Sequence, residues 1–144
     1  MSRGDAAARR LYAWEDREVA PRDLSRVPFA QLQALADHVW AAEGLRWPPR
    51  LRPLPPQARA TVARATRLAI EAPPVLPSWV LLHELAHAMT STADGANDGH
   101  GPRFVGLYLR LLVLHARMPE AALAASLHRA GIPFEPEARP IFLA

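Results

Sequence analysis

The chain has 144 residues, a formal net charge of +3 and no cysteine, and this length is typical of one domain with its own hydrophobic core. The lack of cysteine excludes disulfide frameworks, thiolate nucleophiles and Cys-ligated zinc, so a metal site would have to use histidine and carboxylate ligands. Half of the residues are hydrophobic and 22% are charged, which is a globular composition and not a disordered one.

The sequence predicts neither a membrane span nor an N-terminal signal peptide. No hydrophobic run approaches the ~20 residues that a membrane span needs. The first ten residues are small and charged and lack the apolar stretch of a signal peptide. We therefore expect a cytoplasmic protein without a membrane partner, built as a single domain over residues 1–144. Residues 1–27 and 132–144 are predicted to be irregular, apart from a short helix around residues 9–15.

The first strong periodicity follows Pro28. Apolar residues recur on one helical face up to a stop at Gly44; they are Phe29, Leu32, Ala36, Val39 and Trp40. Five prolines between residues 45 and 56 then exclude a helix and favour an extended segment near residues 50–52. Leu68 and Ile70 alternate with more polar or smaller residues, which predicts a half-buried strand, with a helix over 57–66 as the alternative.

Three helices are predicted in the second half. Ser78 is a good N-cap for a helix that ends near Met89. Pro102 suits the first position of a helix that extends to about residue 117. The only charged residues of this helix lie seven apart, so most of the helix surface should be buried. Pro119 opens the last helix, which stops at Gly131. These patterns predict an α+β domain in which an N-terminal helix and a small antiparallel sheet precede a pair of packed helices.

The first of these helices carries the sequence His83-Glu84-Leu85-Ala86-His87. Residues four apart share a helix face, so both imidazoles can bind one metal ion. Glu84 is rotated by about 100° from His83, from where its carboxylate can reach a water on that metal. This H-E-x-x-H arrangement is typical of zinc hydrolases. The alternative is that these side chains lie on a solvated face.

A catalytic zinc needs a third protein ligand and an open position for water. The candidates are His100, His115, His128, Asp94 and Asp98. His100 is favoured, because it follows a turn-rich loop and directly precedes the Pro102 helix. Asp94 and Asp98 are better explained as turn residues, although either could accept the free N–H of a ligand histidine.

Two further features allow both a functional and a structural interpretation. Tyr108 could polarise a substrate carbonyl near the metal, but filling the core is favoured. The segment from Gly44 to Ile70 has no acidic residue and six arginines, namely Arg46, Arg50, Arg52, Arg59, Arg64 and Arg67. Such a basic patch could bind nucleic acid or an acidic partner. The favoured explanation is a solvated outer face, since every basic residue of this chain is arginine.

The HExxH motif followed by His100-Gly101-Pro102-Arg103-Phe104 resembles the SprT-like zinc metallopeptidases, in which an H-G-x-x-F box supplies the third ligand. The chain resembles a set of actinobacterial HExxH metallohydrolases more closely still, including at the Tyr-Ala-Trp-Glu segment of residues 12–15. The motif match covers about residues 78–110 and a weaker similarity about 9–115. The resemblance implies His83, His87 and His100 as ligands, Glu84 as the base, and a small sheet packed on the metal helices. The cysteine zinc ribbon of some SprT-like proteins is missing, so a DNA-linked role does not transfer.

Together the motif and the resemblance predict a zincin-like domain that hydrolyses peptide bonds in a protein or peptide substrate. We expect one Zn²⁺ per chain and Glu84 as the general base. The strand that ends near Glu71 is expected to bind the extended substrate by β-addition. The alternatives are a zinc-binding module without turnover and a nucleic-acid-associated protein that uses the arginine-rich segment.

Overall fold

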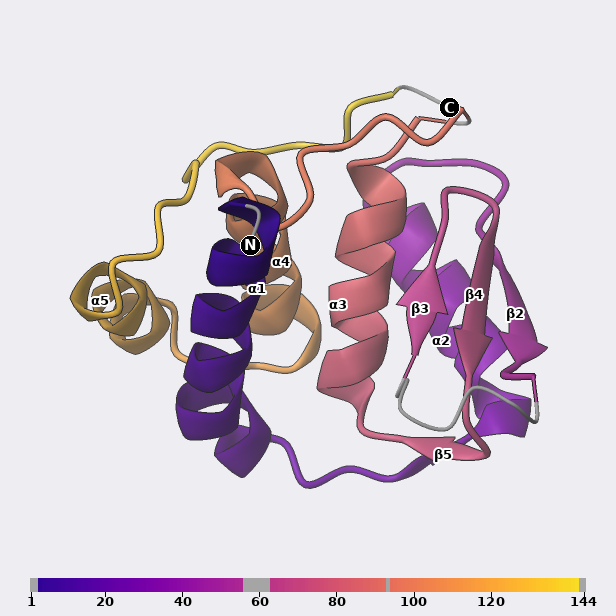
Figure 1. Cartoon of the computed structure of the whole chain (residues 1–144). Helices are drawn as coiled ribbons and strands as arrows, with labels where there is room; N and C mark the ends of the chain where they lie inside the picture. The colour runs from indigo at the N-terminus through magenta and orange to yellow at the C-terminus, as the bar shows by residue number, and fades with distance from the viewer. Residues whose placement is uncertain (1–2, 56–62, 93, 143–144) are drawn as a thin grey trace.

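The computed structural model describes residues 3–55, 63–92 and 94–142, with the backbone alone for residues 3–5. Within these residues the chain has the predicted α+β architecture, with five α-helices and two small sheets. In Figure 1 the three-stranded sheet lies on one side of helix α3 (Ser78–Met89), while α1 (Arg3–Trp14) and α4 (Pro102–His115) lie on its other side. None of the described helices is both long and apolar enough to cross a membrane.

The N-terminal region is helical over residues 3–22. The predicted short helix around residues 9–15 is present, but the prediction of irregular structure is wrong for residues 3–8 and 16–22. Helix α1 continues directly into a π-helical segment, η1 (Glu15–Val19), and a 3-10 turn, η2 (Ala20–Arg22). Leu11, Trp14 and Val19 are fully or almost fully buried and anchor this segment in the core. The pattern was hard to detect because residues 3–10 contain no large apolar side chain.

The larger sheet is mixed, so the predicted small antiparallel sheet is only partly right. Its order is β2-β4-β3: β2 (Arg50–Pro53) pairs in parallel with β4 (Ala69–Ala72), and β3 (Arg64–Ala65) pairs antiparallel with β4. A separate antiparallel pair joins β1 (Val27–Pro28) to β5 (Val75–Leu76). Most of the alternative helix over 57–66 lies outside the described residues, and its last part forms β3.

The position of β4 corrects one functional expectation. Because β4 is the central strand, β2 pairs with it along Ala69–Ala72 on one edge and β3 pairs with Ile70 and Glu71 on the other. An added substrate strand therefore cannot pair there, and the predicted β-addition at the strand ending near Glu71 is wrong. The strand of this sheet that lies beside α3 is β3 (Figure 1).

The predicted helices of the core are present. Helix α2 (Phe29–Ala42) buries the expected residues Leu32, Ala36, Val39 and Trp40, and Gly44 follows its end with a φ of 75°. Helices α3 and α4 pack against each other, and α4 is buried over most of its surface, as its sequence predicts. Helix α5 (Glu120–Arg129) follows α4 and ends before Gly131.

Helix α3 is capped by a distant segment and not by Ser78, which is its first residue. The carboxylate Oδ2 of Asp23 accepts the backbone N–H of Trp79 (2.8 Å) and the Ser78 hydroxyl (2.6 Å). The hydroxyl of Ser25 accepts the backbone N–H of Ser78 at 2.9 Å. The loop after η2 therefore satisfies two of the N–H groups that every helix start leaves without an intrahelical partner.

The C-terminal residues 132–142 contain no helix or strand, as predicted. Two backbone hydrogen bonds nevertheless attach them to the end of α3 and to the start of α4. The N–H of Glu135 donates to the carbonyl of Pro102 (3.0 Å), and the N–H of Ile141 donates to the carbonyl of Met89 (3.1 Å). Pro102 begins α4 and Met89 ends α3. This tail therefore ties together the two ends of the loop that carries His100.

Candidate metal centre

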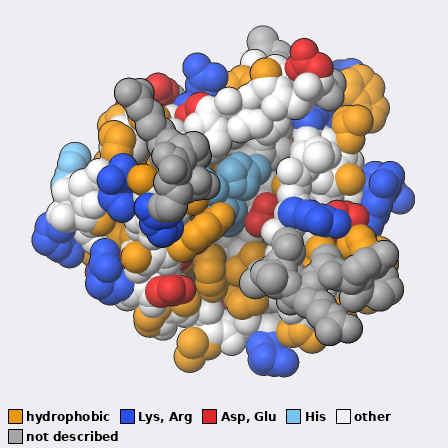
Figure 2. All heavy atoms as spheres, in the orientation of Figure 1, with side chains coloured by type: hydrophobic (Ala, Val, Ile, Leu, Met, Phe, Trp, Pro, Cys, Tyr) orange, Lys and Arg blue, Asp and Glu red, His pale blue; other side chains and the backbone are white. Residues whose placement is uncertain are grey.

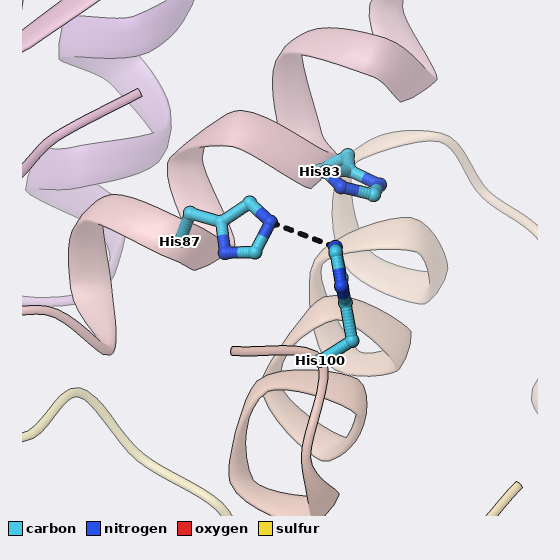
Figure 3. A group of neighbouring side chains, drawn as sticks. All are labelled: His83, His87 and His100. Atoms are coloured by element: carbon cyan, nitrogen blue, oxygen red, sulfur yellow. Dashed lines mark hydrogen bonds between the residues drawn. The ribbon is translucent and has the colours of Figure 1, made fainter. Parts of the chain in front are cut away.

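Three histidines converge between α3 and the start of α4. His83 and His87 lie one turn apart on α3, and His100 ends the loop before α4 (Figure 3). One ring nitrogen from each lies within 4.8 Å of the others, and the Nε2 atoms of His87 and His100 are 3.1 Å apart. Three imidazole nitrogens this close together suit a borderline-soft ion such as Zn²⁺.

The cluster is reachable from solvent on one side. His83 is buried with 6% of its surface exposed, whereas His87 and His100 are half-buried. Figure 2 shows histidine side chains at the centre of this face, inside a hollow. Phe104 supports the cluster from the core, since its buried ring stacks on His87 with the ring centres 4.2 Å apart. The aromatic residue of the His-Gly-x-x-Phe box therefore holds one of the candidate ligands.

A buried carboxylate holds the ring of His83. The Nδ1–H of His83 donates to Oε2 of Glu15 at 2.6 Å, and the Tyr108 hydroxyl donates to the same oxygen at 2.7 Å. Glu15 is only 3% exposed. The sequence prediction named Asp94 or Asp98 as acceptors for a ligand histidine, but the acceptor for His83 is Glu15.

Asp94 and Asp98 have local roles in the loop. Oδ2 of Asp98 accepts the N–H groups of Arg103 (3.0 Å) and Phe104 (3.3 Å), so this residue caps α4. Asp94 is exposed and accepts the hydroxyl of Thr92. Both are turn and cap residues, which is the interpretation that the sequence favoured. By capping α4, Asp98 also fixes the backbone immediately after His100.

The two tyrosines near the cluster differ in exposure. Tyr108 is fully buried and its hydroxyl is committed to Glu15, so it fills the core and does not face a substrate. Tyr12, which the sequence analysis did not select, is 48% exposed and its ring centre lies 5.5 Å from that of His100. Tyr12 and Glu15 lie three residues apart on one helical segment. The sequence signals for them were this spacing and the Tyr-Ala-Trp-Glu segment on which part of the family resemblance rests.

Burial controls the charges of the cluster. Burial lowers the pKa of His87 to about 2, helped by the nearby positive charge of His83, and lowers the pKa of His100 to about 4. Burial also acts to lower the pKa of His83, but the hydrogen bond and charge of Glu15 outweigh it and the pKa is raised. His87 and His100 are therefore neutral at pH 7, which is the form that binds a metal.

Glu84 lies beside the histidines and is 7% exposed. Burial raises the pKa of Glu84 to about 7, while the charge of His83 opposes this shift and that of Glu15 adds to it. A carboxyl with a pKa near neutrality can both take up and release a proton.

An acidic residue just after the arginine-rich segment, Glu71, pairs with two of its arginines in the sheet. The exposed residues Arg52 and Arg64 flank Glu71 across the sheet, and Arg64 forms an ion pair with Glu71. The guanidinium carbon of Arg67 lies 4.8 Å from the ring centre of Trp40 and is part of the packing. Arg46 and Arg50 are exposed, and Arg59 lies outside the described residues. This arrangement fits the solvated outer face that the sequence favoured.

The remaining candidate ligands lie away from the cluster. The ring of His115 packs against that of His38, with centres 5.8 Å apart, and the ring of His128 packs near that of Phe134. Neither belongs to the group of possible ligands among the described residues.

No protein-family model, no curated protein and no solved structure matches this chain. The resemblance to SprT-like zinc metallopeptidases therefore rests on the motif residues alone and stays a prediction.

Proposed function

We propose that this protein is a zinc-dependent hydrolase of zincin-like fold that cleaves peptide bonds. His83, His87 and His100 hold the ion in this proposal, and Glu84 is the general base. The observation that carries it is the convergence of three histidine nitrogens within 4.8 Å of one another on an H-E-x-x-H helix, in a hollow of the surface (Figures 2 and 3).

The donor set fits zinc with a position left for chemistry. Three neutral imidazoles are the ligand set of several catalytic zinc sites, whereas structural zinc sites have four protein ligands. Among the described residues, the group contains three. When bound, the ion would lower the pKa of a water molecule and polarise a substrate carbonyl.

The chain's own residues supply the proton transfer. The Glu84 carboxylate accepts the proton of the attacking water and later gives it to the leaving amine. Its burial beside His83 removes bulk water that would compete for this transfer. The half-exposed ring of Tyr12 borders the space that a substrate would enter.

The sheet provides a place for an extended substrate. β3 lies at the edge of the sheet beside α3, and its pairing among the described residues is with β4 alone. A peptide that pairs with β3 would run along the helix that carries the candidate ligands.

The decisive variant is Glu84→Gln, which keeps the shape of the side chain but removes the proton acceptor. The purified wild-type protein should hold about one zinc per chain, and the variant should fold and retain zinc equally well. Hydrolysis of unfolded proteins or peptide libraries should fall by at least about 100-fold in the variant. Zinc content is measured by elemental analysis and cleavage by mass spectrometry.

Two outcomes would contradict the proposal. A Glu84→Gln protein that cleaves at the wild-type rate would remove Glu84 as the base. A variant that loses zinc would make Glu84 a ligand and indicate a structural zinc module without turnover. His87→Ala is the matched control, since it should lose both the metal and the activity.

A further inference from the structure

Glu15 is a buried acid held by two hydrogen-bond donors. Its Oε2 atom accepts hydrogen bonds from His83 Nδ1 (2.6 Å) and from the Tyr108 hydroxyl (2.7 Å), and only 3% of the residue is exposed. Burying a carboxylate is strongly unfavourable unless it is well compensated. Neither His83 nor Tyr108 has to carry a positive charge that would compensate the carboxylate. An apolar side chain at this position would therefore fill the core more favourably than Glu15 does.

We propose that Glu15 is a positioning residue for the candidate metal centre, and this inference rests on the proposed function. An ionised carboxylate can only accept hydrogen bonds, so Glu15 requires His83 to carry its proton on Nδ1. The Nε2 atom of His83 is then left as the ligand atom. Glu15 also increases the basicity of the imidazole, as carboxylates do when they bind the outer nitrogen of a ligand histidine.

The backbone around Glu15 is built to hold it in place. Glu15 begins the π-helical segment η1, and such wide turns inside helices occur frequently at functional sites. The preceding residue, Trp14, is fully buried and donates its ring N–H to the Ser126 hydroxyl of α5 at 2.8 Å. α1 is therefore anchored to α5 immediately before the carboxylate reaches His83.

Tyr108 donates the second hydrogen bond that holds the Glu15 carboxylate. Its ring is fully buried between Trp14 and Phe104, with ring centres 6.3 and 5.5 Å away. Phe104 in turn stacks on His87. One packed row of side chains thus connects Glu15 to the ring of a second candidate ligand, so that the orientations of His83 and His87 depend on the same core.

The test compares the zinc affinity of Glu15→Gln with that of a matched control. Glutamine keeps the size of the side chain and an acceptor oxygen but removes the charge. The control is Glu43→Gln, since the side chain of Glu43 is 2% exposed and pairs with Arg110, outside the group of His83, His87 and His100. Affinity is measured by competition with a chelator, together with the visible absorption of the Co²⁺-loaded protein and with urea unfolding of the metal-free protein.

Glu15→Gln should bind zinc about 10- to 100-fold more weakly and change the Co²⁺ spectrum, while Glu43→Gln binds like the wild type. Equal affinities for Glu15→Gln and wild type would overturn the inference and leave the proposed function intact. A loss of affinity that Glu43→Gln shows to the same extent would also overturn it, because the cause would then be general destabilisation. A wild-type protein that binds no zinc would remove the proposed function and this inference together.

If Glu15→Gln does not fold, Tyr108→Phe decides the question. This variant keeps the buried ring and removes one of the two hydrogen bonds that hold Glu15. It should weaken zinc binding about fivefold, the usual net value of one hydrogen bond. Unchanged affinity in a folded Tyr108→Phe protein would overturn the role of Glu15.

Discussion

His100 is the candidate ligand that depends most on structure far from the motif helix. It ends a loop whose last turn is held by Asp98, which caps α4, and its ring lies close to His87 and His83. Sequence spacing alone could not place it there, because a loop of this length can bring many residues near the helix.

We predict that His100→Ala weakens zinc retention as much as His87→Ala does. Each variant removes one of the three candidate imidazole ligands, so both should lose most of the metal during dialysis against a weak chelator. His115→Ala and His128→Ala are the controls and should retain the wild-type zinc content by elemental analysis. Loss of zinc in His115→Ala together with retention in His100→Ala would show that the ligand assignment is wrong.

Some residues of the candidate site can be predicted from the local sequence, and others cannot. His83, Glu84 and His87 could be predicted because helical spacing alone brings them together. Glu15 could not, because it lies 68 positions from His83 in the sequence and only the packing of the N-terminal helical segment against α3 and α4 places it there. The same packing buries Tyr108, while Tyr12 stays at the rim.

Helices formed as predicted where the hydrophobic periodicity of the sequence is strong. α2, α4 and α5 matched because large apolar residues repeat on one face and proline or glycine marks their ends. Only the second half of α1 was predicted, since its exposed side is rich in alanine and arginine and only Leu11 and Trp14 mark its buried face. The parallel pairing of β2 with β4 was missed because strand order depends on the path of the chain between them, which no local pattern specifies.

Asp23 gives a prediction at the scale of the element, since it caps α3 from another segment. Asp23→Ala should lower the free energy of unfolding by about 1 kcal/mol at pH 7, the usual value of an N-cap. Burial acts to raise the pKa of Asp23, but hydrogen bonds from Ser78, Ser25 and Trp79 outweigh it and the pKa is lowered.

The sign of the pH dependence follows from that shift. A carboxyl whose pKa is lower in the folded protein stabilises it fully above the unfolded pKa of about 3.9, and this stabilisation is lost as the pH falls through the folded pKa. The difference between wild type and Asp23→Ala in urea unfolding should therefore shrink below pH 4. Asp37→Ala, at an exposed position of α2, should show no comparable effect. A difference that stays constant down to pH 2 would exclude the carboxylate as the stabilising group.

At the scale of the whole molecule, the C-terminal tail (residues 132–142) packs against α4 at Gly106. A Cβ atom at Gly106 would lie 1.9 Å from the carbonyl oxygen of Glu135, far inside contact distance. Alanine is a better helix former than glycine by about 1 kcal/mol, but here it would push the tail away and break the bond between Glu135 and Pro102.

We therefore predict that Gly106→Ala destabilises the protein despite its better helix propensity. Overpacking typically costs about 1–3 kcal/mol, and the better helix propensity offsets about 1 kcal/mol of it. Because the clash is so close, we expect the upper end of the range and a net loss of about 2 kcal/mol in urea unfolding. Leu114→Ala in the same helix is the control; its side chain is 53% exposed and the change should stay within about 0.5 kcal/mol. A more stable Gly106→Ala protein would mean that the tail does not pack on α4 in solution.

The tail also bears on how the protein is made, because it joins the two ends of the His100 loop only after the rest of the domain exists. A chain synthesised as far as residue 99 contains two of the three histidines, and the bonds to Met89 and Pro102 require residues 141 and 135. Contacts between such distant positions form late and slowly during folding. The growing polypeptide would therefore expose the histidines before they are held together, and the His100 loop would be fixed at both ends only once residues 135 and 141 dock.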